Sequence, residues 1–148
     1  MTSSNFTHLK SILLIDDDES SNFLNTIFIN KLDLDIDVHA TLNGQEGLDF
    51  IMNNGDFEGD DVLSTPCMIM LDINMPLMNG WQFMEKYEEL VPKSLKEQIF
   101  IVLVTISDSI EDKRKAKENP YINEFIQKPL SDIKFKKLIN KHFKEVIV

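Results

Sequence analysis

The feature that most constrains this chain is a short apolar run, residues 67–71, that ends abruptly at Asp72. A continuous apolar run bounded by turn residues is typical of a strand buried on both faces, as in parallel sheets. Pro76 and Gly80 supply the turn signals after it. Ligands of open α/β sheets bind beyond the carboxyl ends of the strands, so we expect Asp72 to serve chemistry rather than packing.

Other strand-like runs also end in polar residues. Residues 11–15 run into Asp16 and Asp17, residues 99–104 into Thr105, and residues 124–127 into Lys128 and Pro129. If these strands lie parallel in one sheet, their ends bring carboxylates, a hydroxyl and an ammonium to one edge. Carboxylates suit a hard cation, whereas a hydroxyl and an ammonium suit phosphoryl oxygens. The pattern therefore predicts a site for a metal ion and a phosphoryl group.

The segments between these strands predict helices. A further strand is expected over residues 36–40. Five helices are also expected. They run from the caps at 20–22 to about residue 31, from 43–44 to 52, from 80 to a point before Pro92, from 109 to 118, and from Ser131 or Asp132 to 142. The stretch 109–118 has only two apolar residues, Ile110 and Ala116, so we expect weak anchoring. The alternation of strands and helices predicts an α/β fold, a doubly wound five-stranded parallel sheet with five helices.

Length and composition favour one globular domain. The 148 residues are 43% apolar and contain no linker, so we expect a single domain over 1–148 with a core at about 10–143. The one cysteine, Cys67, excludes an internal disulfide and fits a reducing compartment. No run is long enough to cross a bilayer, and the start lacks a signal-peptide core. We therefore expect a cytoplasmic protein with no membrane association.

The charge is unevenly distributed. The net charge is −10; residues 1–80 contain 14 acidic and 2 basic side chains, whereas residues 81–148 contain 11 and 13. Nucleic-acid phosphates require a basic footprint, so we do not expect nucleic acid as a partner. The acidic half contains the predicted metal site, as a bound divalent cation requires.

Four signatures, taken together and in this order, resemble the receiver domain of two-component response regulators. They are the acidic pair Asp16 and Asp17, Asp72 with its Met75-Pro76 and Gly80 loop, Thr105, and Lys128-Pro129. The similarity covers roughly residues 10–143 and implies the flavodoxin-like strand order 2-1-3-4-5. With nothing fused to it, the chain resembles a stand-alone receiver of the chemotaxis or phosphorelay type.

The resemblance also implies a role for each site residue. Asp72 is the implied phosphoacceptor. The implied direct ligands of Mg²⁺ (or Mn²⁺) are Asp17, Asp72 and the main-chain carbonyl of Asn74, with Asp16 acting through water. By the same resemblance, Thr105 and Lys128 each bind a phosphoryl oxygen, Phe125 is an aromatic switch, and Lys128-Pro129 is a candidate cis bond. Family members usually carry a small residue after the threonine, where this chain has Ile106. We expect the bulk of Ile106 to slow the entry of hydrolytic water.

The implied function is a phosphorylatable switch rather than an enzyme. The implied partners are a histidine kinase or histidine phosphotransfer protein and an unknown downstream protein, which binds a face built from 109–118, strand 124–127 and the last helix. We expect a monomer or weak dimer.

Two other functions remain open. A Mg²⁺-dependent phosphatase of the haloacid dehalogenase type also uses a strand-end aspartate, although it places the nucleophile after the first strand and leaves Asp72 unexplained. The third possibility is an interaction module that ignores phosphate, against which the complete set of acids, threonine and lysine argues. Phe125 can also be a core residue, and Asp56, Glu58 and Asp60 resemble a calcium loop only faintly.

Overall fold

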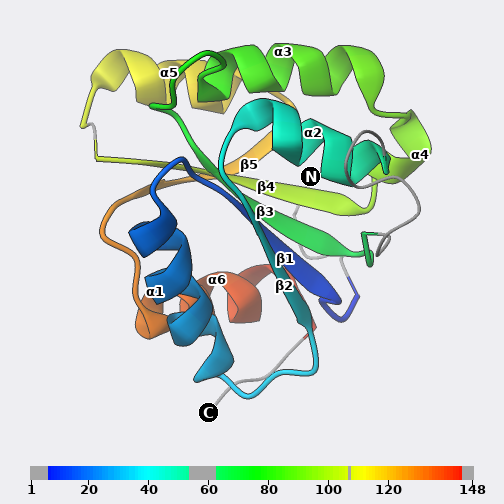
Figure 1. The fold of residues 1–148 in the computed structure, drawn as a ribbon, viewed down its shortest axis with the longest axis vertical. Helices are drawn as coiled ribbons and strands as arrows, with labels where there is room; N and C mark the ends of the chain where they lie inside the picture. Colours follow the sequence, from blue (N-terminus) through cyan, green and yellow to red (C-terminus); the bar gives the residue numbers. More distant parts are fainter. Residues whose placement is uncertain (1–6, 54–62, 107, 145–148) are drawn as a thin grey trace.

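The computed structural model describes residues 7–53, 63–106 and 108–144, which form a parallel sheet between two layers of helices (Figure 1). The sheet order is β2-β1-β3-β4-β5. The strands are β1 (Ser11–Ile15), β2 (Asp37–Thr41), β3 (Cys67–Asp72), β4 (Ile99–Thr105) and β5 (Ile122–Gln127). The predicted fold class and strand order are confirmed.

Six helices are present among the described residues, one more than predicted. They are α1 (Glu19–Asn30), α2 (Gly44–Met52), α3 (Gly80–Leu90), α4 (Lys93–Lys96), α5 (Ile110–Glu118) and α6 (Asp132–His142). The extra helix is the single turn α4. Pro92, which was expected only to close the preceding region, is its N-cap, because a fixed φ and a missing N–H suit proline to the start of a helix.

Two apolar cores separate the layers. Helices α2, α3 and α5 cover one face of the sheet, and α1 and α6 cover the other (Figure 1). Every residue of β1, β3 and β4 is buried, as expected for strands that have helices on both faces. The central strands therefore form a rigid platform, and their carboxyl ends carry the polar residues.

The register brings these strand ends level with one another. Ile15 pairs with Leu71, and Asp72 pairs with Val104. Thr105 pairs with Gln127, the residue before Lys128. Asp16, Asp72, Thr105 and Lys128 consequently lie at the same edge of the sheet, as the pattern of polar strand ends predicted.

The start of α1 differs from the expectation that residues 20–22 supply the cap. The N-cap is Asp18, whose side chain accepts a hydrogen bond from the Ser20 backbone N–H. Asn22 is buried instead, and its amide donates to the carbonyl oxygens of Asp16 (3.0 Å) and Thr41 (3.4 Å). Asn22 thus ties the ends of β1 and β2 together beneath the acidic residues.

The second half of the chain follows the predictions closely. Helix α5 buries only Ala116, which confirms its weak anchoring. Strand β5 begins two residues earlier than expected, and a register shift leaves Asn123 as an extra residue whose side chain accepts from the Ile101 N–H (2.9 Å). The Lys128-Pro129 peptide bond is cis, as expected.

Two further expectations concern loops and membranes. Most of the polar loop around residues 53–65, including the calcium-like residues 56–60, lies outside the described residues. Among the helices that the structure describes, none combines the length and apolar character needed to cross a bilayer.

Candidate metal and phosphoryl site

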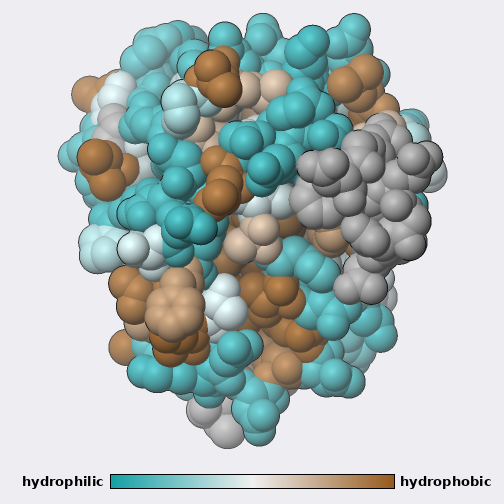
Figure 2. All heavy atoms as spheres, viewed as in Figure 1, coloured by the Kyte–Doolittle hydropathy of each residue, from teal (hydrophilic) through white to brown (hydrophobic). Residues whose placement is uncertain are grey.

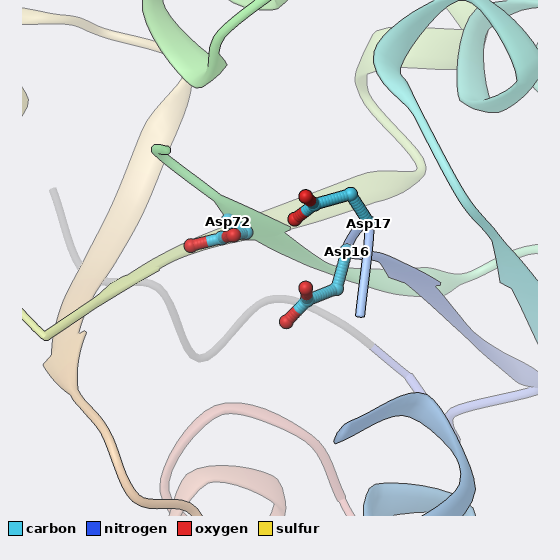
Figure 3. Close-up of side chains that lie close together, drawn as sticks. All are labelled: Asp16, Asp17 and Asp72. Carbon is cyan, nitrogen blue, oxygen red and sulfur yellow. The ribbon is translucent and has the colours of Figure 1, made fainter. Parts of the chain in front are cut away.

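Three carboxylates converge at the carboxyl edge of the sheet (Figure 3). Asp16 and Asp17 follow β1, and Asp72 ends β3. One oxygen from each lies within 4.8 Å of the others. Asp16 and Asp72 are both only 6% exposed, whereas Asp17 is exposed. The cluster thus has a buried base and one open side.

Local hydrogen bonds fix the orientation of Asp16. Its Oδ1 accepts a hydrogen bond from the Asp18 backbone N–H at 2.9 Å. Its Oδ2 accepts another from Lys128 Nζ at 2.9 Å. Both oxygens of Asp16 thus have partners within the chain, and these fix its carboxylate beside Lys128.

Lys128 places its ammonium between two of these carboxylates. Its Nζ lies 2.9 Å from Asp16 Oδ2 and 3.6 Å from Asp72 Oδ1. Although burial opposes the charged form, the hydrogen bond to Asp16 and the attraction of Asp72 raise the pKa of Lys128. Lys128 therefore stays charged and partly neutralises the cluster.

Asp72 is a member of the cluster whose negative charge is costly in the fold. Burial is the main cause that raises its pKa to about 6, and the negative charges of Asp16 and Asp17 raise it further. Lys128 and the Asn74 backbone N–H lower the pKa but do not cancel the effect of burial. A carboxylate whose charge is costly attracts a further cation or another charge-neutralising ligand.

The loop after β3 packs tightly against the site. The Gly80 N–H donates to the Ile73 carbonyl oxygen at 2.8 Å. A Cβ on Gly80 would lie 2.9 Å from the Asp72 carbonyl oxygen, so only glycine allows α3 to start this close to β3. Between them, Leu77 adopts a φ of 68° and is 98% exposed. The loop thus packs against the backbone of Asp72 and exposes the apolar side chain of Leu77.

The remaining predicted residues occupy different positions. Thr105 is fully buried at the end of β4, and its carbonyl oxygen accepts from the Lys128 N–H at 2.8 Å. Asn74 is exposed and reaches the site through its backbone N–H. Phe125 is half-buried, packs against the core on the α5 side, and lines a groove of about 300 Å³ with Ala116 and Lys117. Phe125 is therefore neither a full core residue nor an exposed one.

The donor set suits a small hard cation. Mg²⁺ takes oxygen ligands, keeps several waters and needs only one or two carboxylates. The exposed Asp17 and the buried Asp72 offer such oxygens with an open side for water. The residues present thus fit Mg²⁺ or Mn²⁺. The side-chain amide of Asn22 holds the end of β1 by donating to backbone carbonyl oxygens. This role was not predicted from the sequence, because a polar residue at the start of a helix is normally taken as a cap.

The fold and site together define an α/β domain with an acidic pocket and a lysine at the carboxyl edge of a doubly wound sheet. The family model of the response regulator receiver domain matches residues 12–140. This chain belongs to the response regulator receiver domain family. The family is that of a phosphoacceptor switch rather than a conventional enzyme, which disfavours the haloacid dehalogenase alternative.

Individual relatives agree with this assignment. The Two-component response regulator 24 of Arabidopsis thaliana is 26% identical over 129 residues, which cover 87% of this chain and 81% of that protein. A two-component response regulator from Cytophaga hutchinsonii superposes with a TM-score of 0.74 at 27% identity, covering 90% of this chain and 96% of its own. The bacteriophytochrome response regulator RtBRR gives 0.73 at 26% identity, with coverages of 90% and 77%.

Proposed function

We propose that this chain is a single receiver domain that accepts a phosphoryl group on Asp72 from a histidine kinase or histidine phosphotransfer protein. The observation that carries the proposal is the position of Lys128 Nζ, 3.6 Å from Asp72 Oδ1 and 2.9 Å from Asp16 Oδ2. An ammonium at this place can neutralise the carboxylate before transfer and a phosphoryl oxygen afterwards. Positioning and charge neutralisation are most of what phosphoryl transfer requires.

The proposed step is an in-line displacement. A carboxylate oxygen of Asp72 attacks the phosphorus of a phosphohistidine, a P–O bond forms, and the P–N bond breaks with its electron pair returning to the imidazole. Lys128 moves its hydrogen bond from a carboxylate to a phosphoryl oxygen. Thr105 supplies a hydroxyl donor once its buried side chain turns toward the phosphoryl group, and the half-buried Phe125 then packs inward. These movements are a population shift between two packings.

The direct test is the mass of the intact protein after exposure to a small-molecule phosphodonor with Mg²⁺. We expect one phosphoryl group per chain, located on Asp72 by peptide mapping after chemical trapping. Phosphorylation at another residue contradicts the proposal, and so does steady turnover of a generic phosphate ester without a phosphorylated protein.

A divalent cation is expected to stabilise the protein through the same carboxylates. When bound, Mg²⁺ neutralises charge on the carboxylate and phosphoryl oxygens. A ligand at ten times its Kd adds about 1.4 kcal/mol of stability, or about 3–6 °C in Tm for a chain of this size. We expect thermal unfolding with and without MgCl₂ or MnCl₂ to show this shift in wild type. Asp17→Asn should lose it, whereas Asp18→Asn, which keeps a good N-cap, should retain it.

Exposed apolar residues follow the strands that build the site. Phe23 (68% exposed) and Leu24 lie on α1 after Asp16 and Asp17, and Leu77 lies on the loop after Asp72. Figure 2 shows an apolar area over α1. Such residues next to the acidic site suit the apolar face of a partner that must bring its phosphohistidine to Asp72.

The corresponding variant is Phe23→Ser. We expect it to slow phosphoryl transfer from a purified histidine phosphotransfer protein by about tenfold, because an aromatic anchor of the complex is lost. The rate with a small phosphodonor should not change, because the exposed phenyl ring of Phe23 supplies neither the nucleophile nor a charged group for the phosphoryl oxygens. The control is Leu90→Ser, which also changes an exposed apolar residue (50% exposed) to serine but lies at the C-terminal end of α3. Equal slowing by both variants contradicts the assignment.

Ile106 is expected to lengthen the lifetime of the phosphoaspartate. It follows Thr105 directly and is 73% exposed, so its side chain is available to cover a phosphoryl group on Asp72. We expect Ile106→Ala to speed dephosphorylation by about two- to tenfold, because water gains access. The measurement is the decay of phosphoprotein after removal of the donor. Ile110→Ala, also exposed but on α5, should leave the decay unchanged; an unaltered rate in Ile106→Ala rejects this role.

A further inference from the structure

The loop that carries Lys128 is held by a second lysine, Lys134 on α6. Lys134 Nζ donates to the carbonyl oxygens of Gln127 (2.9 Å) and Pro129 (2.5 Å), the residues on either side of Lys128. Figure 1 shows this loop running from β5, at the edge of the sheet, to the layer that α6 shares with α1. The hydrogen bonds of Lys134 thus bracket the residue whose ammonium lies between two carboxylates of the site.

The peptide unit that joins Gln127 to Lys128 needs a donor on the open side of the sheet. Its N–H donates to the Thr105 carbonyl oxygen of β4 at 2.8 Å, so its own carbonyl oxygen points the opposite way. Strand β5 is the edge strand of the described sheet, and no further strand offers an N–H on that side. Backbone carbonyl groups require a partner. Lys134 supplies the donor and so holds this peptide unit from the side opposite Thr105.

The charge of Lys134 is the opposite of what its place in the helix favours. Lys134 is the third residue of α6, and its N–H donates to the side chain of the N-cap Ser131 at 3.1 Å. Acidic side chains are favoured at this position by the helix dipole and by the capping box. A lysine loses that stabilisation, and its two bonds to carbonyl oxygens offset the loss. The ammonium therefore serves the loop before α6 rather than the helix itself.

We propose that Lys134 is a positioning residue for phosphoryl transfer to Asp72, because it fixes the backbone around Lys128 and so places the Lys128 ammonium. Lys128 Nζ lies 3.6 Å from Asp72 Oδ1, and a displacement of about 1 Å is enough to slow a reaction that depends on positioning. Lys134 acts through Lys128 rather than on the reacting atoms. The inference rests on the proposed function, but the state of the Lys128 loop can be measured without phosphorylation.

The first test removes the ammonium and keeps the aliphatic stem. With a small phosphodonor and Mg²⁺, Lys134→Met should be phosphorylated about tenfold more slowly than wild type. Lys134→Arg should recover the rate to within about twofold, because a guanidinium also donates to two oxygens. Lys137→Met, the same change at an exposed position one turn along α6, should match wild type. Thermal unfolding checks that each variant is folded, and Lys134→Gln repeats the test if Lys134→Met does not fold.

A double-mutant cycle distinguishes positioning from a general effect on the fold. If Lys134 acts only through Lys128, Lys134→Met should change the rate by less than about twofold in a Lys128→Met background. A general disturbance of the fold would slow the reaction by the same factor in both backgrounds. That result overturns the proposal, and so does a Lys134→Arg variant that reacts as slowly as Lys134→Met.

Amide hydrogen exchange tests the loop in the unphosphorylated full chain. The Lys128 N–H is protected by its bond to Thr105, so release of the loop exposes it to exchange. Lys134→Met should speed the exchange of this amide about tenfold, and Lys137→Met should leave it unchanged. Equal exchange in the two variants overturns the proposal. If wild type accepts no phosphoryl group, the proposed function fails, whereas the exchange result still decides whether Lys134 holds the loop.

Discussion

Replacing Asp72 with asparagine is expected to abolish phosphorylation of this protein by any donor. Asparagine matches aspartate in shape but offers an amide oxygen in place of an anionic nucleophile. The neighbours are not equivalent to it, since Asp16 is held by the Asp18 N–H and Lys128 and Asp17 is exposed, whereas Asp72 is the buried carboxylate at the end of β3. The measurement is the intact mass after incubation with a small phosphodonor and Mg²⁺, in which the variant should stay unmodified at every time point.

Asp18→Asn is the matched control for this experiment. It removes a carboxylate two residues from Asp16 and, like the test variant, makes the chain less negative by one charge. Its side chain caps α1 rather than facing the cluster, and asparagine caps helices as well as aspartate does. We expect full phosphorylation of this variant. If Asp18→Asn loses the modification as well, a general change in charge explains the loss, and Asp72 is not identified as the acceptor.

The architecture of this site could be predicted from sequence because strand ends are easy to recognise. Apolar runs that stop at a single polar residue give both the strand and its carboxyl end, and parallel topology then brings Asp16, Asp72 and Lys128 to one edge. The family resemblance supplied the strand order, and the register of β1, β3 and β4 agrees with both inferences.

Details that depend on packing or on competing hydrogen-bond partners could not be predicted in this way. Residues 18–22 contain several possible caps, and only the packed structure selects Asp18 as the cap and buries Asn22. The one-turn helix α4 is too short to show any period. The side chain of Lys128 lies nearer to Asp16 than to Asp72. The two distances differ by less than 1 Å, and a sequence pattern cannot predict so small a difference.

The same substitution, Asp72→Asn, is expected to stabilise the metal-free protein at neutral and alkaline pH. The folded-state pKa of Asp72 is raised to about 6, mainly by burial, from an ordinary value of 3.8. A carboxyl whose pKa is higher in the folded state than in the unfolded state favours folding while it is protonated. Its contribution to stability is therefore complete below about pH 4 and is lost as the pH rises through about 6.

The difference between wild type and variant isolates this one group. Other carboxylates titrate in both proteins and cancel, so the free energy of unfolding of Asp72→Asn relative to wild type should rise by about 2 kcal/mol between pH 4 and pH 8. Denaturant unfolding in EDTA measures it. Asp18→Asn should show no such gain, because hydrogen bonds to Ser21 and Ser20 lower the pKa of Asp18. A difference that does not vary with pH would show that the charge of Asp72 is not costly in the fold.

Addition of Mg²⁺ should then remove much of the advantage of the variant. The cation stabilises wild type through the carboxylate that asparagine lacks, so the two stability curves should approach each other as the metal concentration rises. The residue that carries the proposed chemistry is thus a carboxylate whose charge the unliganded fold disfavours. Asp72 is a buried anionic nucleophile beside two other carboxylates and one lysine. Its charge lowers the stability of the metal-free protein, and this cost decreases when a cation or a phosphoryl group neutralises the charge.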